Sequence, residues 1–190
     1  MQKTQAYYNL ANGKVKQSVD PNSRLTKNIF DGLGRLTEVD QSSTSTPSAY
    51  ATSTTYVYSD STSTPSMIHR ADYLTGSSII DTYDYYDGFN RLIQERKQSP
   101  ISGTFIAFDK KYNQVGLVAS SSLPYFSTGS GNTTATRVSN LYTNYLYDPL
   151  QRPLTISNIV GTTTNAYAKW TTTTTDANGH ITADSGQIDT

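Results

Sequence analysis

The chain has 190 residues, which is long enough for one domain with a core and only marginally long enough for two. Fifteen basic residues cancel fifteen acidic ones, and this argues against general binding to nucleic acid, which needs a basic surface. The sequence contains no cysteine, so disulfides and thiolate zinc sites are excluded. Apolar residues make up only 35% of the chain, but its 15 tyrosines and many threonines favour a β-sheet.

Taken in chain order, runs of β-branched and aromatic residues alternate with turn-forming residues, and no apolar period of a helix is found. The predicted strands are 5–10, 14–19, 24–30, 35–40, 52–59, 67–73, 78–86, 91–97, 105–112, 117–121, 137–147, 154–158, 165–175 and 180–183. Polar loops are predicted at 41–51, 60–65 and 127–135, and a turn is predicted at 75–76. The apolar runs are too short for a transmembrane span, and no signal-peptide pattern follows Met1.

One seven-residue pattern recurs along the chain: an aromatic residue, Asp, two free positions, Gly, Arg and an aliphatic residue. The clearest copies are 30–36 and 86–92; further copies are 112–118, 147–153 and 175–181, a looser one is 19–25, and 12–15 resembles the end of another. Asp can accept hydrogen bonds from amides of a turn, and Gly supplies a positive φ. Each copy therefore predicts a β-hairpin.

The site residues predicted from these copies are structural. They are Asp20, Arg24, Asp31, Gly34, Arg35, Asp87, Asn90, Arg91, Asn113, Gly116, Asp148, Arg152, Asp176 and Gly179. The Arg begins the outgoing strand, where its guanidinium can stack on the aromatic ring of the same hairpin or reach the Asp. We expect Tyr86, Arg91 and Arg35 to make contacts within and between hairpins rather than to line a pocket. Gln151 and Pro153 depart from the pattern, which predicts a differently built turn or a sheet edge.

Catalytic and metal sites are weaker interpretations of the same residues. The only histidines are His69 and His180, and a structural role is favoured for each because one His is weak evidence for a site. An Asp that recurs in every turn is explained by capping that turn, not by a pair of glycosidase carboxylates. The residues after Asp176 lack the Glu that completes a calcium loop. We therefore predict no catalytic residue, no cofactor and no metal.

At these heptads the chain resembles the YD-repeat family. The family includes bacterial Rhs proteins, the B and C components of Tc insecticidal toxin complexes, wall-associated proteins and animal teneurins. The resemblance spans roughly residues 8–181 and implies a long sheet that spirals into a hollow shell, often around a toxic C-terminal domain. The sequence contains no DPxGL-type motif, toxin domain or β-propeller, so we expect residues 1–190 to be one sheet region, from a larger shell or a short stand-alone relative.

The predicted fold is therefore all-β, with tandem antiparallel β-hairpins in an extended, curved sheet. The predicted function is structural: the wall of a shell that encapsulates or presents a cargo in a secreted or surface-associated bacterial protein whose export signal lies outside this chain. The alternative is an extracellular module that recognises a glycan or a partner protein through the sheet face or the Ser/Thr-rich loops; an enzyme is third. The expected partners are neighbouring repeats, or further copies joined through sheet edges.

Overall fold

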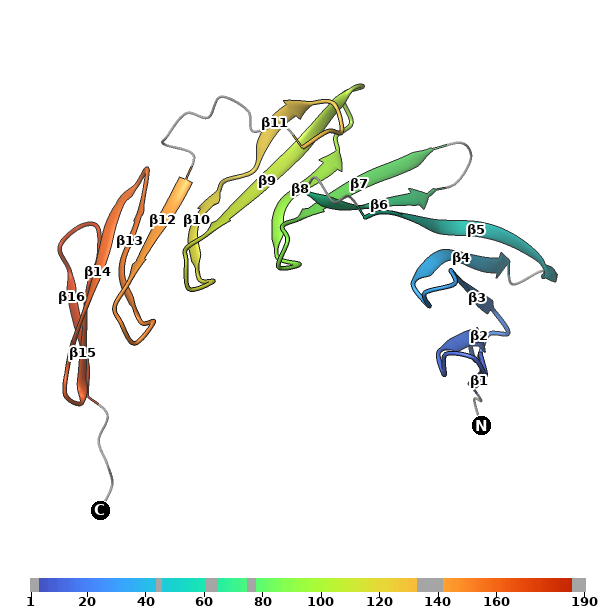
Figure 1. Ribbon diagram of the computed structural model, residues 1–190, viewed down its shortest axis with the longest axis horizontal. Helices are drawn as coiled ribbons and strands as arrows, with labels where there is room; N and C mark the ends of the chain where they lie inside the picture. Colours follow the sequence, from blue (N-terminus) through green and yellow to red (C-terminus); the bar gives the residue numbers. More distant parts are fainter. Residues whose placement is uncertain (1–3, 44–45, 61–64, 75–77, 133–141, 186–190) are drawn as a thin grey trace, which may run out of the picture. The chain divides into compact units, whose positions relative to one another are not determined.

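The computed structural model describes residues 4–43, 46–60, 65–74, 78–132 and 142–185 (Figure 1). The chain forms two compact units, Met1–Asn90 and Arg91–Thr190. The described residues contain strands and turns but no helix, and their strand pairings are antiparallel. These observations confirm the predicted all-β class built from tandem hairpins.

The first unit is a sheet whose strands pair in chain order. Its strands are β1 (Gln5–Tyr8), β2 (Val15–Val19), β3 (Leu25–Phe30), β4 (Leu36–Ser43), β5 (Thr46–Ser59), β6 (Ser66–Tyr73) and β7 (Ile79–Tyr86). Few apolar side chains are buried in it: Ala71 and Tyr85 are the buried hydrophobic residues among those described. Stability must therefore come largely from strand pairing and from contacts between neighbouring strands.

The second unit is also a sheet of antiparallel strands, but β11 (Tyr125–Thr128) departs from the chain-order pairing because it pairs with β9 (Thr104–Tyr112). Its strands are β8 (Leu92–Gln98), β9 (Thr104–Tyr112), β10 (Val118–Ser122), β11 (Tyr125–Thr128), β12 (Tyr142–Tyr147), β13 (Pro153–Asn158), β14 (Gly161–Ala168), β15 (Thr171–Thr175) and β16 (Ile181–Ser185). Strands β10 and β11 both pair with β9, and β12 pairs with β10. The pair Leu123-Pro124 separates β10 from β11, and Pro124 cannot donate a backbone hydrogen bond to the sheet.

Turns alternate between the two ends of the strands because consecutive strands run in opposite directions. In the first unit, the turns at 9–14, 31–35 and 87–90 share one end with Asp60, and the turn at 20–24 lies at the other. In the second unit, the turns at 113–117, 148–152 and 169–170 share one end, while 158–161 and 176–180 share the other. We call the end with residues 31–35 or 148–152 the clasp end of its unit, and the opposite end the far end.

The polar loop predicted at 41–51 is wrong. Strand β4 continues to Ser43 and β5 begins at Thr46, with Gln41 paired to Ala51 and Ser42 paired to Tyr50. Serine and threonine suggested a loop, but threonine is β-branched and suits a strand that has a partner. Residues 44–45 lie outside the described part of the chain.

Residues 165–175, predicted as one strand, form parts of two strands with a turn at Lys169-Trp170. Lys169 adopts a φ of 51°, so the turn forms without the glycine, proline or asparagine that would have signalled it. The loop predicted at 127–135 is also partly wrong, because β11 extends to Thr128. The predicted turn at 75–76, residues 61–64 of the predicted loop and residues 137–141 of a predicted strand lie outside the described residues.

Candidate functional site

The recurrent heptads form turns with one shared backbone pattern. At 31–35, the Gly34 amide donates to the Asp31 carbonyl at 3.0 Å and the Asp31 amide donates to the Arg35 carbonyl at 2.9 Å. The Asp31 Oδ1 atom accepts from the amides of Leu33 and Arg35 at 2.9 and 2.8 Å. Gly34 has a φ of 77°, the left-handed conformation that favours glycine.

The same bonds recur at the other copies. The turn-opening side chain caps its turn at Asp20, Asp31, Asp87, Asn113, Asp148 and Asp176. The fourth position has a positive φ at Ser23, Gly34, Asn90, Gly116, Gln151 and Gly179. The predicted turn residues are thus brought together within each turn. The fourth position can be a residue other than glycine, as Ser23, Asn90 and Gln151 show.

The interpretation of Gln151 as a sign of a different turn is wrong. Gln151 has a φ of 65°, and its amide donates to the Asp148 carbonyl at 2.9 Å, as at the other copies. Strand β13, which begins at Pro153, lies between β12 and β14 and is not an edge strand. The Asp148 cap therefore holds a non-glycine residue in the left-handed conformation.

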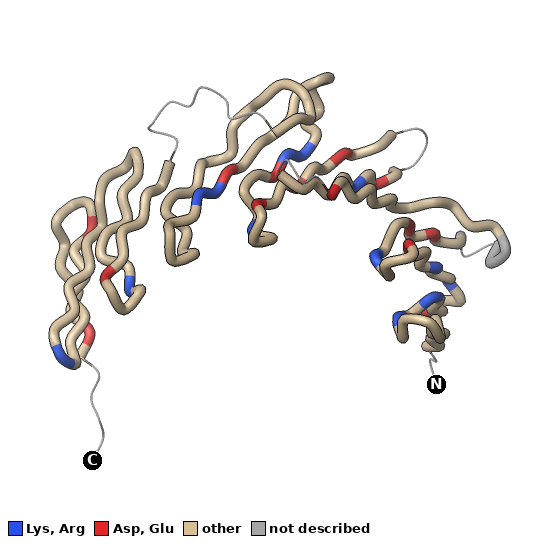
Figure 2. Tube along the Cα trace, in the orientation of Figure 1, with Lys and Arg blue, Asp and Glu red and all other residues tan. Residues whose placement is uncertain are grey.

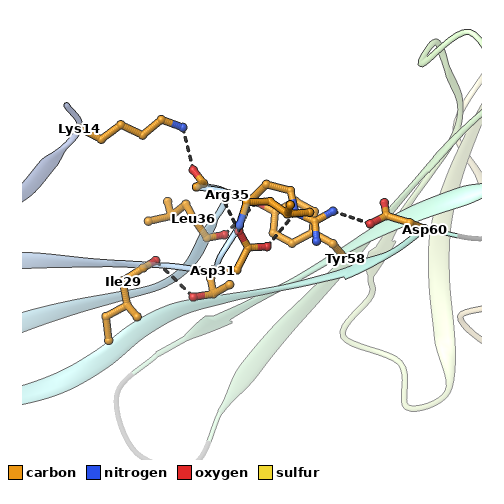
Figure 3. A network of polar contacts seen from close by, with 10 residues as sticks. Lys14, Ile29, Asp31, Arg35, Leu36, Tyr58 and Asp60 are labelled. Carbon is orange, nitrogen blue, oxygen red and sulfur yellow. Dashed lines mark hydrogen bonds and ion pairs between the residues drawn. The ribbon is translucent and has the colours of Figure 1, made fainter. Parts of the chain in front are cut away.

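Each arginine turn of the clasp end is joined to the next strand by a tyrosine, and Figure 3 shows this arrangement at Arg35 and Tyr58. The Arg35 Nε donates to Asp31 Oδ2 at 2.8 Å, and Arg35 Nη1 lies 2.6 Å from Asp60 Oδ2. The guanidinium carbon of Arg35 lies 4.4 Å from the centre of the Tyr58 ring, and the Tyr58 hydroxyl donates to the Leu36 carbonyl at 2.8 Å. We call this group of Asp, Arg, the following carbonyl and the tyrosine a clasp.

The clasp is repeated in the second unit. The guanidinium carbon of Arg152 lies 4.1 Å from the centre of the Tyr167 ring, and Arg152 Nε donates to Asp148 Oδ2 at 2.7 Å. The Tyr167 hydroxyl donates to the Pro153 carbonyl at 2.9 Å. Arg91 stacks on Tyr112 at 4.4 Å, and Tyr112 donates to the Leu92 carbonyl at 2.9 Å.

Two copies retain only part of the clasp. At 113–117 the arginine is replaced by Leu117, yet the Tyr147 hydroxyl still donates to the Val118 carbonyl at 2.9 Å. Near the start of the chain Lys14 takes the place of arginine, and its Nζ lies 5.7 Å from the centre of the Phe30 ring. The tyrosine hydroxyl bond therefore forms without the cation.

The prediction that arginine stacks on the aromatic residue of its own hairpin is wrong. Arg35 stacks on Tyr58, which ends the next strand, and not on Phe30. The prediction that arginine can reach the Asp of its own turn is met at Arg35. Sequence spacing could not show the tyrosine partner, because the hydroxyl bonds join residues 22, 20, 29 and 14 positions apart. The available signal is an aromatic residue at the end of the strand after each Arg.

The charged side chains of a clasp shift each other's pKa values. The side-chain hydrogen bond from Arg35 is the main cause that lowers the pKa of Asp31, and Asp31 and Asp60 in turn raise the pKa of Arg35. Burial alone would raise the pKa of Asp148, but hydrogen bonds from Arg152 lower it overall. The carboxylates are thus held in their charged, hydrogen-bond-accepting form.

Among the described residues, the two heptad turns of the far end, at 20–24 and 176–180, do not form the contact between arginine and tyrosine that defines the clasp. Arg24 donates its backbone amide to Asp20 at 2.8 Å, and its side chain is exposed. His180 takes the arginine position of the last copy, where its Nδ1 lies 3.1 Å from Asp176 Oδ2. The backbone hydrogen bond from His180 is the main cause that lowers the pKa of Asp176.

A buried polar cluster on β8 and β9 was not predicted. Arg96 is fully buried, and its Nε donates to Gln94 Oε1 at 2.9 Å. Gln94 Nε2 donates to Asp109 Oδ1 at 2.7 Å, and Arg96 Nη2 donates to Ser127 Oγ at 2.8 Å. Arg96 also donates to the carbonyls of Thr128 and Gly129, so this one side chain reaches across β9 and links β8 to the β11 segment.

His69 is held within the β6–β7 ladder. Its Nε2 lies 2.7 Å from Asp81 Oδ1, and its ring stacks on Tyr83 with the two ring centres 4.3 Å apart. These two contacts are sufficient to account for His69 as a structural residue of the sheet. The described residues contain no group of three or more His, Asp or Glu side chains that could hold a metal ion. No helix in the described part of the chain could cross a membrane.

Comparison by sequence finds no matching family model and no matching curated protein. Solved structures do match. One is a crystal structure of TcdB2-TccC3-Cdc42, with a TM-score of 0.73 over 92% of this chain at 14% identity. Another is the Photorhabdus luminescens Tc holotoxin pore with a mutated TccC3, with a TM-score of 0.75 over 92% at 14% identity.

This chain spans 14% and 13% of the length of those two chains. At this identity the similarity shows the fold. It bears out the resemblance to Tc toxin components that the heptads predicted.

Proposed function

We propose that the chain is one YD-repeat sheet region, part of the wall of a larger β-sheet shell in a secreted or surface-associated bacterial protein. The observation that carries the proposal is the clasp, which ties each arginine turn of the clasp end to a tyrosine of the neighbouring strand. A sheet held by such ties can be extended repeat by repeat without a second layer of structure. The described residues support this by burying more polar than apolar side chains.

The proposed role requires no chemistry of its own. The turn aspartates accept hydrogen bonds from their own turns, and the arginines stack on tyrosines of the same sheet. Acidic and basic residues are interspersed along both units (Figure 2). A mixed surface of this kind carries no large field of one sign, so such a wall would not select its cargo by charge.

Imaging the full-length natural protein by electron microscopy tests the proposal. We expect these strands to form part of the wall of a hollow shell. A separate module with these strands folded into a closed sandwich would overturn it.

Removal of a clasp separates a structural role from a binding role. Arg152→Ala should lower the melting temperature of the chain, because Tyr167 and Asp148 both lose a contact. Arg24→Ala is the matched control, since Arg24 holds the same position in an exposed far-end turn. A glycan array read with both variants completes the test. If Arg152→Ala abolished glycan binding without lowering the melting temperature, the binding-module alternative would replace the wall.

A further inference from the structure

The third residue of each heptad turn is exposed, and its chemistry differs between the two ends of the strands. It is apolar at Leu33, Phe89, Val115 and Leu150, which are 78%, 82%, 67% and 72% exposed. It is Asn at 22 and 178. The turn backbone is the same in both sets, so the turn itself does not require an apolar residue there.

The apolar tips lie at the clasp end of each unit. In the second unit Val115 and Leu150 share this end with Trp170, which is 73% exposed, while Asn178 lies at the far end. In the first unit Leu33 shares the clasp end with Leu10, which is fully exposed, while Asn22 lies at the far end. We call the exposed apolar residues at the clasp end of one unit its tip row. The tip row is Leu10, Leu33 and Phe89 in the first unit, and Val115, Leu150 and Trp170 in the second.

In the second unit the tip row has a regular spacing. The turns of Val115, Leu150 and Trp170 are two strands apart in the sheet, which places successive tips roughly 9–10 Å apart, given the usual distance between strands. Beside Leu150 the charges are paired within the turn, with Arg152 2.6 Å from Asp148. Lys169, next to Trp170, is exposed and adds one positive charge. A second tip row that approaches therefore meets mainly apolar side chains, with little charge to repel it.

We propose that the tip row is an association surface at which a second copy of this chain docks, tip row against tip row. Exposed large apolar side chains in a row mark interaction surfaces. Val115, Leu150 and Trp170 together offer on the order of 300–400 Å² of apolar surface, about half of what one partner buries in a standard interface. Association is therefore weak. A partner with the same repeat spacing can engage several tips at once, which favours a second copy.

The inference goes beyond the wall role, because it concerns the ends of the strands and not the clasps within the sheet. Sedimentation velocity of the full chain, from low micromolar to several hundred micromolar, should show reversible self-association. The triple variant Leu33→Asn, Val115→Asn and Leu150→Asn should weaken it at least tenfold. Asparagine is chosen because it occupies the same turn position at 22 and 178.

The matched control removes exposed apolar residues from the far end. Ile159 and Val160 are 62% and 83% exposed there, and the pair Ile159→Asn and Val160→Asn should leave association unchanged. Trp170 is the one tryptophan in the sequence, so quenching of its fluorescence by acrylamide reports on the tip row directly. Quenching should fall as the wild-type chain associates.

Four results would overturn the proposal. They are a wild-type chain that stays monomeric throughout, a triple variant that associates like wild type, an equal loss of association in the far-end control, or a Trp170 signal that ignores association. Persistent association of the triple variant would assign self-association to the sheet edges instead. If the triple variant did not fold, Leu150→Asn alone should still weaken association about threefold, and no weakening would count against the tip row.

Discussion

Gly161 should be among the least replaceable glycines of the second unit. A methyl group built at Gly161 would lie 2.5 Å from the Cβ of Ala177 and 3.5 Å from its Cα. Both atoms are fixed to the backbone of the neighbouring far-end turn, so neither can rotate away. Gly161 also has a φ of 151°, a conformation that side chains rarely adopt.

The cost of Gly161→Ala follows from these two terms. Overpacking against a rigid neighbour costs about 1–3 kcal/mol, and the backbone strain costs a similar amount. With partial relaxation of the two turns we expect a loss of roughly 2–4 kcal/mol, or a melting temperature lowered by about 5–12 °C. Adding Ala177→Gly removes the clash but not the strain, so it should restore about 1–2 kcal/mol.

Thermal unfolding and hydrogen exchange of the single and double variants measure these effects. Exchange should rise in β14 to β16, where the two turns meet, more than in β8 and β9. Gly179→Ala is the control for strain alone, because Gly179 has a φ of 84° and open space around it, and it should cost about 1 kcal/mol. A wild-type melting temperature for Gly161→Ala, or no rescue by Ala177→Gly, would refute the reasoning.

Three further predictions concern the clasps and the buried cluster. Tyr58→Phe removes the hydrogen bond to the Leu36 carbonyl and should cost about 1 kcal/mol by urea unfolding; an unchanged midpoint would show that the bond contributes nothing. The pKa of Asp31 is lowered in the folded chain, so its stabilisation is present above the ordinary value of 3.8 and is lost as the pH falls through the lowered value. The urea midpoint should therefore fall between about pH 4 and about pH 2, and less steeply in Asp31→Asn; equal slopes would contradict this. Arg96→Ala should cost roughly 3–5 kcal/mol and expose the amides of 125–129 to exchange, whereas retained protection there would mean that β11 is held by its pairing with β9 alone.

The turns could be predicted from the sequence because their chemistry is local. An Asp at the first position and a glycine or asparagine at the fourth satisfy each other within five residues, as at 31–35. The turn at Lys169 could not be predicted, because a lysine in the left-handed conformation is held there by the pairing of β14 with β15. Strand β5 was missed at its start for a related reason: its pairing with β4 decides its structure more than its Ser/Thr composition does.

Only one of the two side-chain contacts of Arg35 in the clasp could be predicted from the sequence. The link from Asp31 to Arg35 is local and could be predicted, whereas the link from Arg35 to Tyr58 depends on which strand lies beside which. Connections of different length separate the partners, so no fixed spacing marks them. The Arg96 cluster was missed because a charged residue within a strand normally suggests an exposed face.

The direction of the clasp restricts how such a chain can change its length. Arg35 begins one strand and Tyr58 ends the next, so both must lie at the same end of the sheet. Loss or duplication of two consecutive strands leaves the direction of all later strands unchanged, so every later clasp stays at the same end of the sheet. Loss of a single strand within a clasp separates its arginine from its tyrosine, and it moves every later clasp, arginine and tyrosine together, to the opposite end of the sheet. Natural or engineered variants of this sheet should therefore gain and lose strands in pairs.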